Sequence, residues 1–118
     1  MEFGRAVIVD SLGSVELRPS QPVIYDREIG LRLLYQDPDS GAEHYLIRYP
    51  AGLKARVHRH TAAHTIVVLE GRLEVNNQVI GPGGVIVISS SPRLAGRSQP
   101  AATFRSPASA SAVCSTSR

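Results

Sequence analysis

Short apolar segments separated by turn-forming residues occupy most of this chain and limit what it can fold into. No window shows a 3.6-residue apolar period over the length of a helix, whereas many short strands at regular spacing are typical of a β-sandwich or barrel. The pattern therefore predicts an all-β fold. The candidate strands are Val15–Arg18, Val23–Tyr25, Leu31–Tyr35, His44–Tyr49, His64–Leu69, Leu73–Val75, Gln78–Ile80 and Val85–Ile88.

The residues between these segments contain Pro, Gly or Asn. Gly and Asn accept a positive φ and Pro fixes its own φ, so 38–41, 50–52, 70–72 and 81–84 are expected to be turns. Asn76 and Asn77 stand alone between two apolar segments, which predicts a tight hairpin of type I′.

Length and composition bound the class of protein. With 118 residues, 42% hydrophobic and 19% charged, the chain has room for one ordinary globular domain, which excludes full disorder and a coiled coil. No apolar run approaches the roughly 18 residues that a membrane span needs, so no membrane partner is expected. The single cysteine, Cys114, excludes an intrachain disulfide framework. These features favour a cytoplasmic location.

The net charge of +3 comes from one part of the chain. Residues 1–88 hold nine Lys and Arg against ten Asp and Glu, whereas residues 89–118 hold four Arg and no acid. A nucleic-acid-binding domain carries a basic face or helix aimed at its target. None is visible in the strand-rich part, so the sequence predicts no nucleic-acid partner.

The composition changes near residue 89. Nine of the last thirty residues are Ser, against four in the first eighty-eight. This divides the chain into a core, 1–91, and a Ser/Ala/Pro/Arg-rich tail, 92–118. The tail is poorly matched to the fold, because the burial of its few apolar groups offsets little of the entropy lost on ordering. Thr103–Phe104 and Ala112–Cys114 are its candidate strand fragments. Either the sequence from about residue 85–90 onward is read out of frame or otherwise replaces a lost second half of the domain, or it supplies diverged closing strands.

Three of the four histidines, His58, His60 and His64, fall within seven positions. On a strand, His58 and His60 project from the same face, and the bend allowed by 61–63 lets His64 return on the next strand. Neutral imidazoles bind divalent transition metals such as Fe, Zn, Ni or Mn, and three of them leave coordination positions open. The structural alternative is an exposed polar strand face.

The stretch around these histidines resembles the first motif of the cupin superfamily: Gly, five residues, His-x-His, three residues, Glu, six residues, Gly. Gly52, His58, His60 and Gly71 match it, and His64 stands where most members have Glu. The resemblance implies a double-stranded β-helix, the jelly-roll barrel, with a metal in its mouth held by the three histidines.

The second cupin motif, whose histidine supplies another ligand, is absent. The Pro-Gly-Gly turn expected before this motif is present at 82–84 and is followed by an apolar segment. No histidine, however, follows His64 anywhere in the chain. The resemblance thus implies a three-histidine site completed by water, in a barrel that is incomplete at its C-terminal end under the first interpretation of the tail.

In having a histidine in the carboxylate position, the chain is similar to small diketone and acetophenone dioxygenase cupins. That similarity implies an oxygenase acting on a small carbonyl or enol compound. Arg48 is a candidate to bind a substrate carboxylate, and Tyr35 and Tyr45 are candidate pocket walls. For the two tyrosines, amphipathic core positions are the alternative. His44 is expected to be a packing histidine and not a ligand.

Other functions remain open. A non-catalytic cupin module that senses a metal or ligand needs only the bound metal and a moving surface, and a truncated inactive relative needs neither. A small molecule is the expected partner. Thr65–Leu69 is apolar on both faces, which predicts cover by a second sheet or by the partner subunit of a homodimer.

Overall fold

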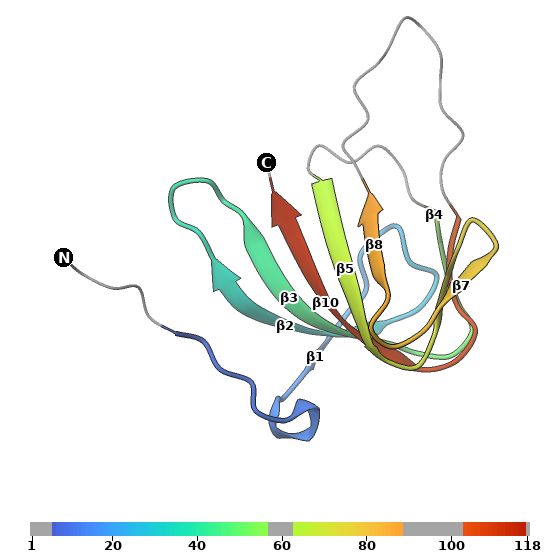
Figure 1. The fold of residues 1–118 in the computed structure, drawn as a ribbon, viewed down its shortest axis with the longest axis horizontal. Helices are drawn as coiled ribbons and strands as arrows, with labels where there is room; N and C mark the ends of the chain where they lie inside the picture. Colours follow the sequence, from blue (N-terminus) through green and yellow to red (C-terminus); the bar gives the residue numbers. More distant parts are fainter. Residues whose placement is uncertain (1–5, 57–62, 89–102, 118) are drawn as a thin grey trace, which may run out of the picture.

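The computed structural model describes residues 6–56, 63–88 and 103–117, and in these residues the chain is almost entirely β (Figure 1). None of the described residues belongs to a helix long and apolar enough to cross a bilayer. The elements in chain order are η1 (Leu12–Ser14), β1 (Arg18–Ser20), β2 (Ile29–Gln36), β3 (Glu43–Tyr49), β4 (Leu53–Arg56), β5 (Ala63–Glu70), β6 (Leu73–Val75), β7 (Gln78–Ile80), β8 (Val85–Ile88), β9 (Thr103–Ser106) and β10 (Ala110–Ser117).

The strands form two antiparallel sheets. The larger has the order β1-β2-β3-β10-β5-β8 and the smaller the order β4-β9-β6-β7. In Figure 1 the large sheet curves through the middle of the molecule and the small sheet stands at its right. This two-sheet jelly-roll arrangement confirms the all-β prediction and the barrel that the sequence resemblance implied.

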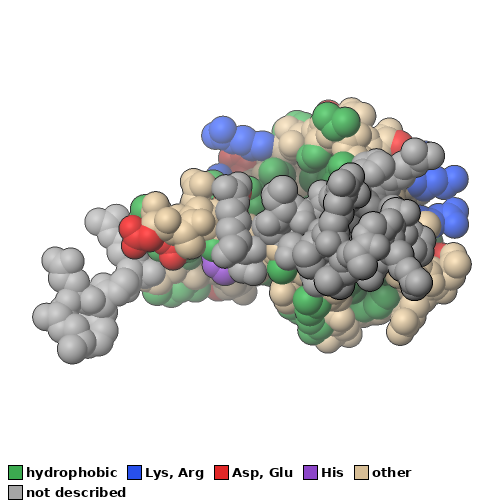
Figure 2. All heavy atoms as spheres, turned by 90° about the horizontal axis from the view of Figure 1, so that it is seen from above, with side chains coloured by type: hydrophobic (Ala, Val, Ile, Leu, Met, Phe, Trp, Pro, Cys, Tyr) green, Lys and Arg blue, Asp and Glu red, His purple; other side chains and the backbone are tan. Residues whose placement is uncertain are grey.

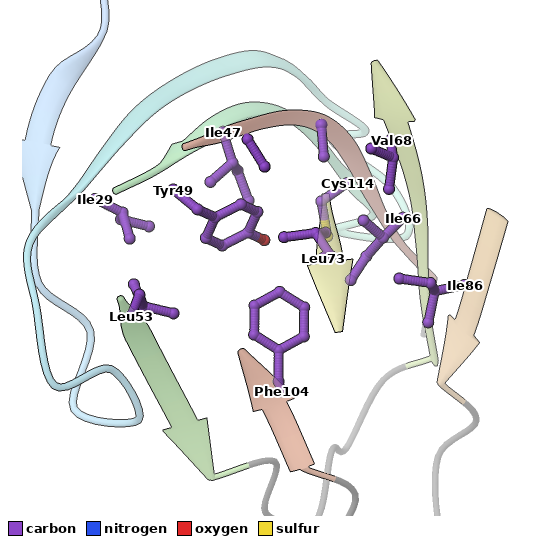
Figure 3. Close-up of a cluster of buried hydrophobic side chains, with 12 residues drawn as sticks. Ile29, Ile47, Tyr49, Leu53, Ile66, Val68, Leu73, Ile86, Phe104 and Cys114 are labelled. Carbon is purple, nitrogen blue, oxygen red and sulfur yellow. The ribbon is translucent and has the colours of Figure 1, made fainter. Parts of the chain in front are cut away.

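The core lies between the inner faces of the two sheets. Phe104 of the small sheet points toward Tyr49 of the large sheet, with ring centroids 5.2 Å apart (Figure 3). On β3, Tyr45, Ile47 and Tyr49 face this core. The sequence alone did not show which of the two faces of this strand lies inside. The buried residues of the cluster are Ile29, Ile47, Tyr49, Leu53, Ile66, Val68, Leu73, Ile86, Phe104, Ala110, Ala112 and Cys114.

The β6–β7 hairpin confirms the turn expected at the paired asparagines. Asn76 and Asn77 have φ values of 51° and 65°, and Val75 pairs with Gln78 across them. Positive φ at both central residues defines a type I′ turn, whose twist matches that of the flanking strands.

The N-terminal strands differ from the prediction. Val15–Leu17 lie outside β1, and in the segment Val23–Tyr25 the only pairing is an isolated bridge from Tyr25 to Ala55. The amide of Tyr25 instead donates to the carbonyl of Pro22, so the chain turns here. Strand β4, by contrast, was not among the candidate strands.

The Ser- and Ala-rich region contributes two strands. β9 pairs with β4 and β6, and β10 lies in the large sheet between β3 and β5. A strand with a neighbour on each side satisfies its backbone groups without large side chains of its own. Ala110 and Ala112 are 1% and 0% exposed, so their small side chains are part of the core. The described part of the tail therefore belongs to the two sheets, and the division of the chain after residue 91 stays a prediction.

Candidate functional site

His64 lies on the inner face of the large sheet. Successive residues of a strand alternate between faces, so His64 shares a face with Ile66 and Val68, and both of these belong to the buried core. The side chain of His64 is half-buried at the start of β5. His58 and His60 lie outside the described residues, so the structure describes one of the three predicted ligands.

Cys114 is next to His64 on the neighbouring strand. β10 runs antiparallel to β5 with Thr116 opposite His64 and Cys114 opposite Ile66, which makes Cys114 a diagonal neighbour of the imidazole. Its Sγ lies 3.7 Å from Nδ1 of His64. The thiol is only 5% exposed, and burial raises its pKa to about 11. Two groups that bind transition metals are thus in contact.

Glu43 and Tyr45 extend this polar group on the other side of β10. Tyr45 is opposite Cys114 and Glu43 is opposite Thr116. The Tyr45 hydroxyl donates a hydrogen bond to the Glu43 carboxylate. Partial burial, and then this hydrogen bond, raise the pKa of Tyr45 to about 12. Glu43, Tyr45, His64 and Cys114 form what we call the inner polar cluster.

The other two predicted pocket residues lie outside this cluster. A bulge between Leu33 and Tyr35 shifts the register of β2, and Tyr35 stacks on His44 with ring centroids 6.2 Å apart. His44 lies opposite Ser115, and its Nδ1 is 2.8 Å from the Ser115 hydroxyl, which agrees with a packing role. Tyr35 is 48% exposed.

Arg48 is exposed on the face of β3 opposite Tyr45 and Tyr49. It lines a surface groove of about 450 Å³ together with Leu17 and Glu28, among others. The structure therefore does not bring Arg48 to Tyr45. The sequence could not show the outer position of Arg48. Side chains alternate between the two faces of a strand, and this alternation does not tell which face lies inside.

Charged side chains are dispersed on the face seen in Figure 2. The Lys and Arg side chains visible in this view lie near its edges, and hydrophobic side chains lie between them. This agrees with the balanced charge counted for residues 1–88. The absence of a nucleic-acid partner remains a prediction.

Cys114 and Glu43 were not anticipated as site residues. The sequence signal for Cys114 is its two-residue spacing from Ala112 and Ala110, which places all three on one face of a strand. That signal says nothing about the neighbours of the strand. Only the pairing of β10 with both β3 and β5 brings Cys114 beside His64 and places Glu43 on the strand beyond β10.

The described donors fit a metal in part. His64 faces the interior beside a thiol, and imidazole with thiolate is a donor set that transition metals accept. Within 6–56, 63–88 and 103–117, however, no group of three or more His, Cys, Asp or Glu residues could hold an ion. A metal site at this place therefore depends on His58 and His60 as well.

Two facing antiparallel sheets with the motif histidine on the inner face define a member of the cupin superfamily. More closely, the profile of the ChrR cupin-like domain family matches residues 12–91, and the chain belongs to this family. No curated protein sequence matches it.

Solved structures share the fold at low sequence identity. An acetylacetone dioxygenase from Acinetobacter johnsonii has a TM-score of 0.74 at 15% identity, over 99% of this chain and 76% of that one. A cupin-like protein from Thermotoga maritima has a TM-score of 0.66 at 12% identity, over 92% and 80%. The anti-sigma factor ChrR, in complex with SigE of Rhodobacter sphaeroides, has a TM-score of 0.65 at 16% identity, over 91% of this chain and 52% of that one.

Proposed function

We propose that this chain is a metal-binding cupin in which His58, His60 and His64 hold a divalent transition metal, such as Fe, Zn, Ni or Mn. The observation that carries the proposal is the inward-facing His64 beside the buried Cys114. The spacing of the other two histidines in the cupin motif supports it. Neutral imidazole is a common ligand for these metals.

Metal analysis of protein purified without a nickel affinity step tests this proposal. The variants His58→Ala and His60→Ala are expected to lose most of the bound metal. His44→Ala is the matched control, because His44 stacks on Tyr35 on the outer face of the sheet. Equal metal content in the wild-type protein and in His60→Ala would refute the site.

The first candidate activity is oxygen-dependent cleavage of a small carbonyl or enol compound. It is supported by the histidine in the carboxylate position and by the fold shared with the acetylacetone dioxygenase. A metal with three neutral ligands keeps its positive charge, which favours an anionic enolate as substrate. Tyr45 remains a candidate pocket residue, because it alone of the three proposed ones faces the interior.

Oxygen uptake distinguishes this activity from the second candidate. With Fe(II) bound, β-diketones or hydroxylated aromatic ketones are expected to cause uptake that a chelator abolishes. Bound metal without uptake across this panel would favour a module that senses a metal or ligand. The family match favours this second candidate, since its namesake ChrR is an anti-sigma factor. No metal and no uptake would indicate an inactive relative.

The assembly and location of the chain are part of the proposal. A homodimer is supported by the outer face of the large sheet, where Val85 and Val87 are 59% and 67% exposed beside the half-buried Val67. Sedimentation at several protein concentrations tests it, and a monomer throughout would refute it. A cytoplasmic location and a small-molecule ligand remain predictions from the sequence.

A further inference from the structure

His64 and Cys114 present two metal-binding atoms of different kinds on paired strands. Nδ1 of His64 and Sγ of Cys114 are 3.7 Å apart. In a tetrahedral zinc site, with Zn–N of about 2.0–2.1 Å and Zn–S of about 2.3 Å, a nitrogen and a sulfur ligand lie about 3.6 Å from each other. The observed separation therefore matches the distance between two ligands of one ion.

The charge of the proposed site also favours a thiolate. Three neutral imidazoles leave both positive charges of the metal uncompensated, and an uncompensated charge beside the buried Cys114 is costly. The Glu43 carboxylate already accepts the hydrogen bond of Tyr45. Cys114, on the strand between Glu43 and His64, supplies a negative charge when its thiol is deprotonated.

We infer that Cys114 is a fourth protein ligand of the metal, binding the same ion as His64 through its thiolate; the inference rests on the proposed function of His58, His60 and His64. As the sulfur–metal bond forms, the S–H bond breaks and the proton passes to solvent, with no change in oxidation state.

This ligand set narrows the choice of metal and of role. Imidazole with thiolate is typical of zinc, and four protein ligands leave a tetrahedral ion without an open position. The inference therefore favours a zinc-binding module that responds to the metal over one that turns over a substrate.

Cobalt(II) added to the full-length protein tests the inference directly. A thiolate bound to cobalt gives an intense near-ultraviolet charge-transfer band, which nitrogen and oxygen ligands do not give. The wild-type protein is expected to show this band, and Cys114→Ser and Cys114→Ala to lose it and to bind cobalt at least roughly tenfold more weakly. Ser115→Ala is the matched control, because it removes a polar atom from the outer face of the same strand and should keep the band.

The outcomes separate this inference from the metal proposal. Stoichiometric cobalt in the wild-type protein without the band would overturn the role of Cys114 and leave the histidine site standing. No bound cobalt would overturn both. Because the wild-type spectrum alone decides, a cysteine variant that fails to fold does not affect the result.

Discussion

Gly71 joins β5 to β6 and closes the histidine motif. Its φ is +75°, and a Cβ there would lie 2.0 Å from the carbonyl oxygen of Ser109 and 2.8 Å from Cα of Ala110. We expect Gly71→Ala to lower the free energy of unfolding by about 2–4 kcal/mol, because a left-handed backbone costs a non-Gly residue about 1–3 kcal/mol and a clash with backbone adds to it. Urea denaturation measures this loss.

Gly81 provides the control for Gly71. A Cβ at Gly81 meets nothing within 4 Å, and its φ is not positive. Gly81→Ala is expected to change the free energy of unfolding by less than about 1 kcal/mol. Equal losses in the two variants would show that the close approach of β5–β6 to Ser109 is not what requires glycine.

Tyr45 makes a pH-dependent contribution to stability. Its pKa is about 12 in the folded protein against 10.0 for an ordinary tyrosine, so the folded state holds this proton more tightly than the unfolded state. The contribution is fully present below pH 10 and is lost as the pH rises from 10 toward about 12. The free energy of unfolding, measured by denaturation at increasing pH, should fall less steeply for Tyr45→Phe than for the wild-type protein over this range. Parallel curves would contradict the raised pKa.

At the scale of elements, the strands that the sequence predicted best are those with their own apolar pattern and turn chemistry. β6, β7 and β8 have the predicted bounds, because Asn76, Asn77 and the glycine-rich turn at 81–84 end them locally. β10 has neither signal. Its inward residues are small and its outward ones include Ser111 and Ser115, so only the strands on both sides of it account for its conformation.

Hydrogen exchange tests whether β10 is a central strand. Its amides and carbonyls face ladders on both sides, so exchange over residues 110–114 is expected to require opening of the large sheet and to be as slow as in the core of β5. Residues 6–10, which precede η1 outside either sheet and include the 80% exposed Ile8, should exchange fast. Rapid exchange through β10, like that of residues 6–10, would contradict its place in the sheet.

At the scale of the whole molecule, the sequence predicted the fold class. The structure places His64 on the inner face of β5, and the metal-binding role of the three histidines stays a prediction. The cupin motif could not predict Cys114, since the contact joins residues 50 positions apart in the chain. Nor could it place Arg48 and Tyr35, whose outer positions depend on the strand faces and on a bulge in β2.

Metal removal is expected to destabilise the whole domain. The proposed ligands come from the cupin motif and from β10, which meet only in the folded state, so a bound ion stabilises that state and not the unfolded chain. Zinc at about 100 times its dissociation constant adds about 2.7 kcal/mol, which raises the Tm of a domain of this size by on the order of 10 °C. Thermal unfolding with added zinc, and again after EDTA, should show this rise and its reversal in the wild-type protein and in His44→Ala. His60→Ala should lose most of the rise, and an equal rise in all three proteins would mean that zinc stabilises the domain from somewhere other than the histidine motif.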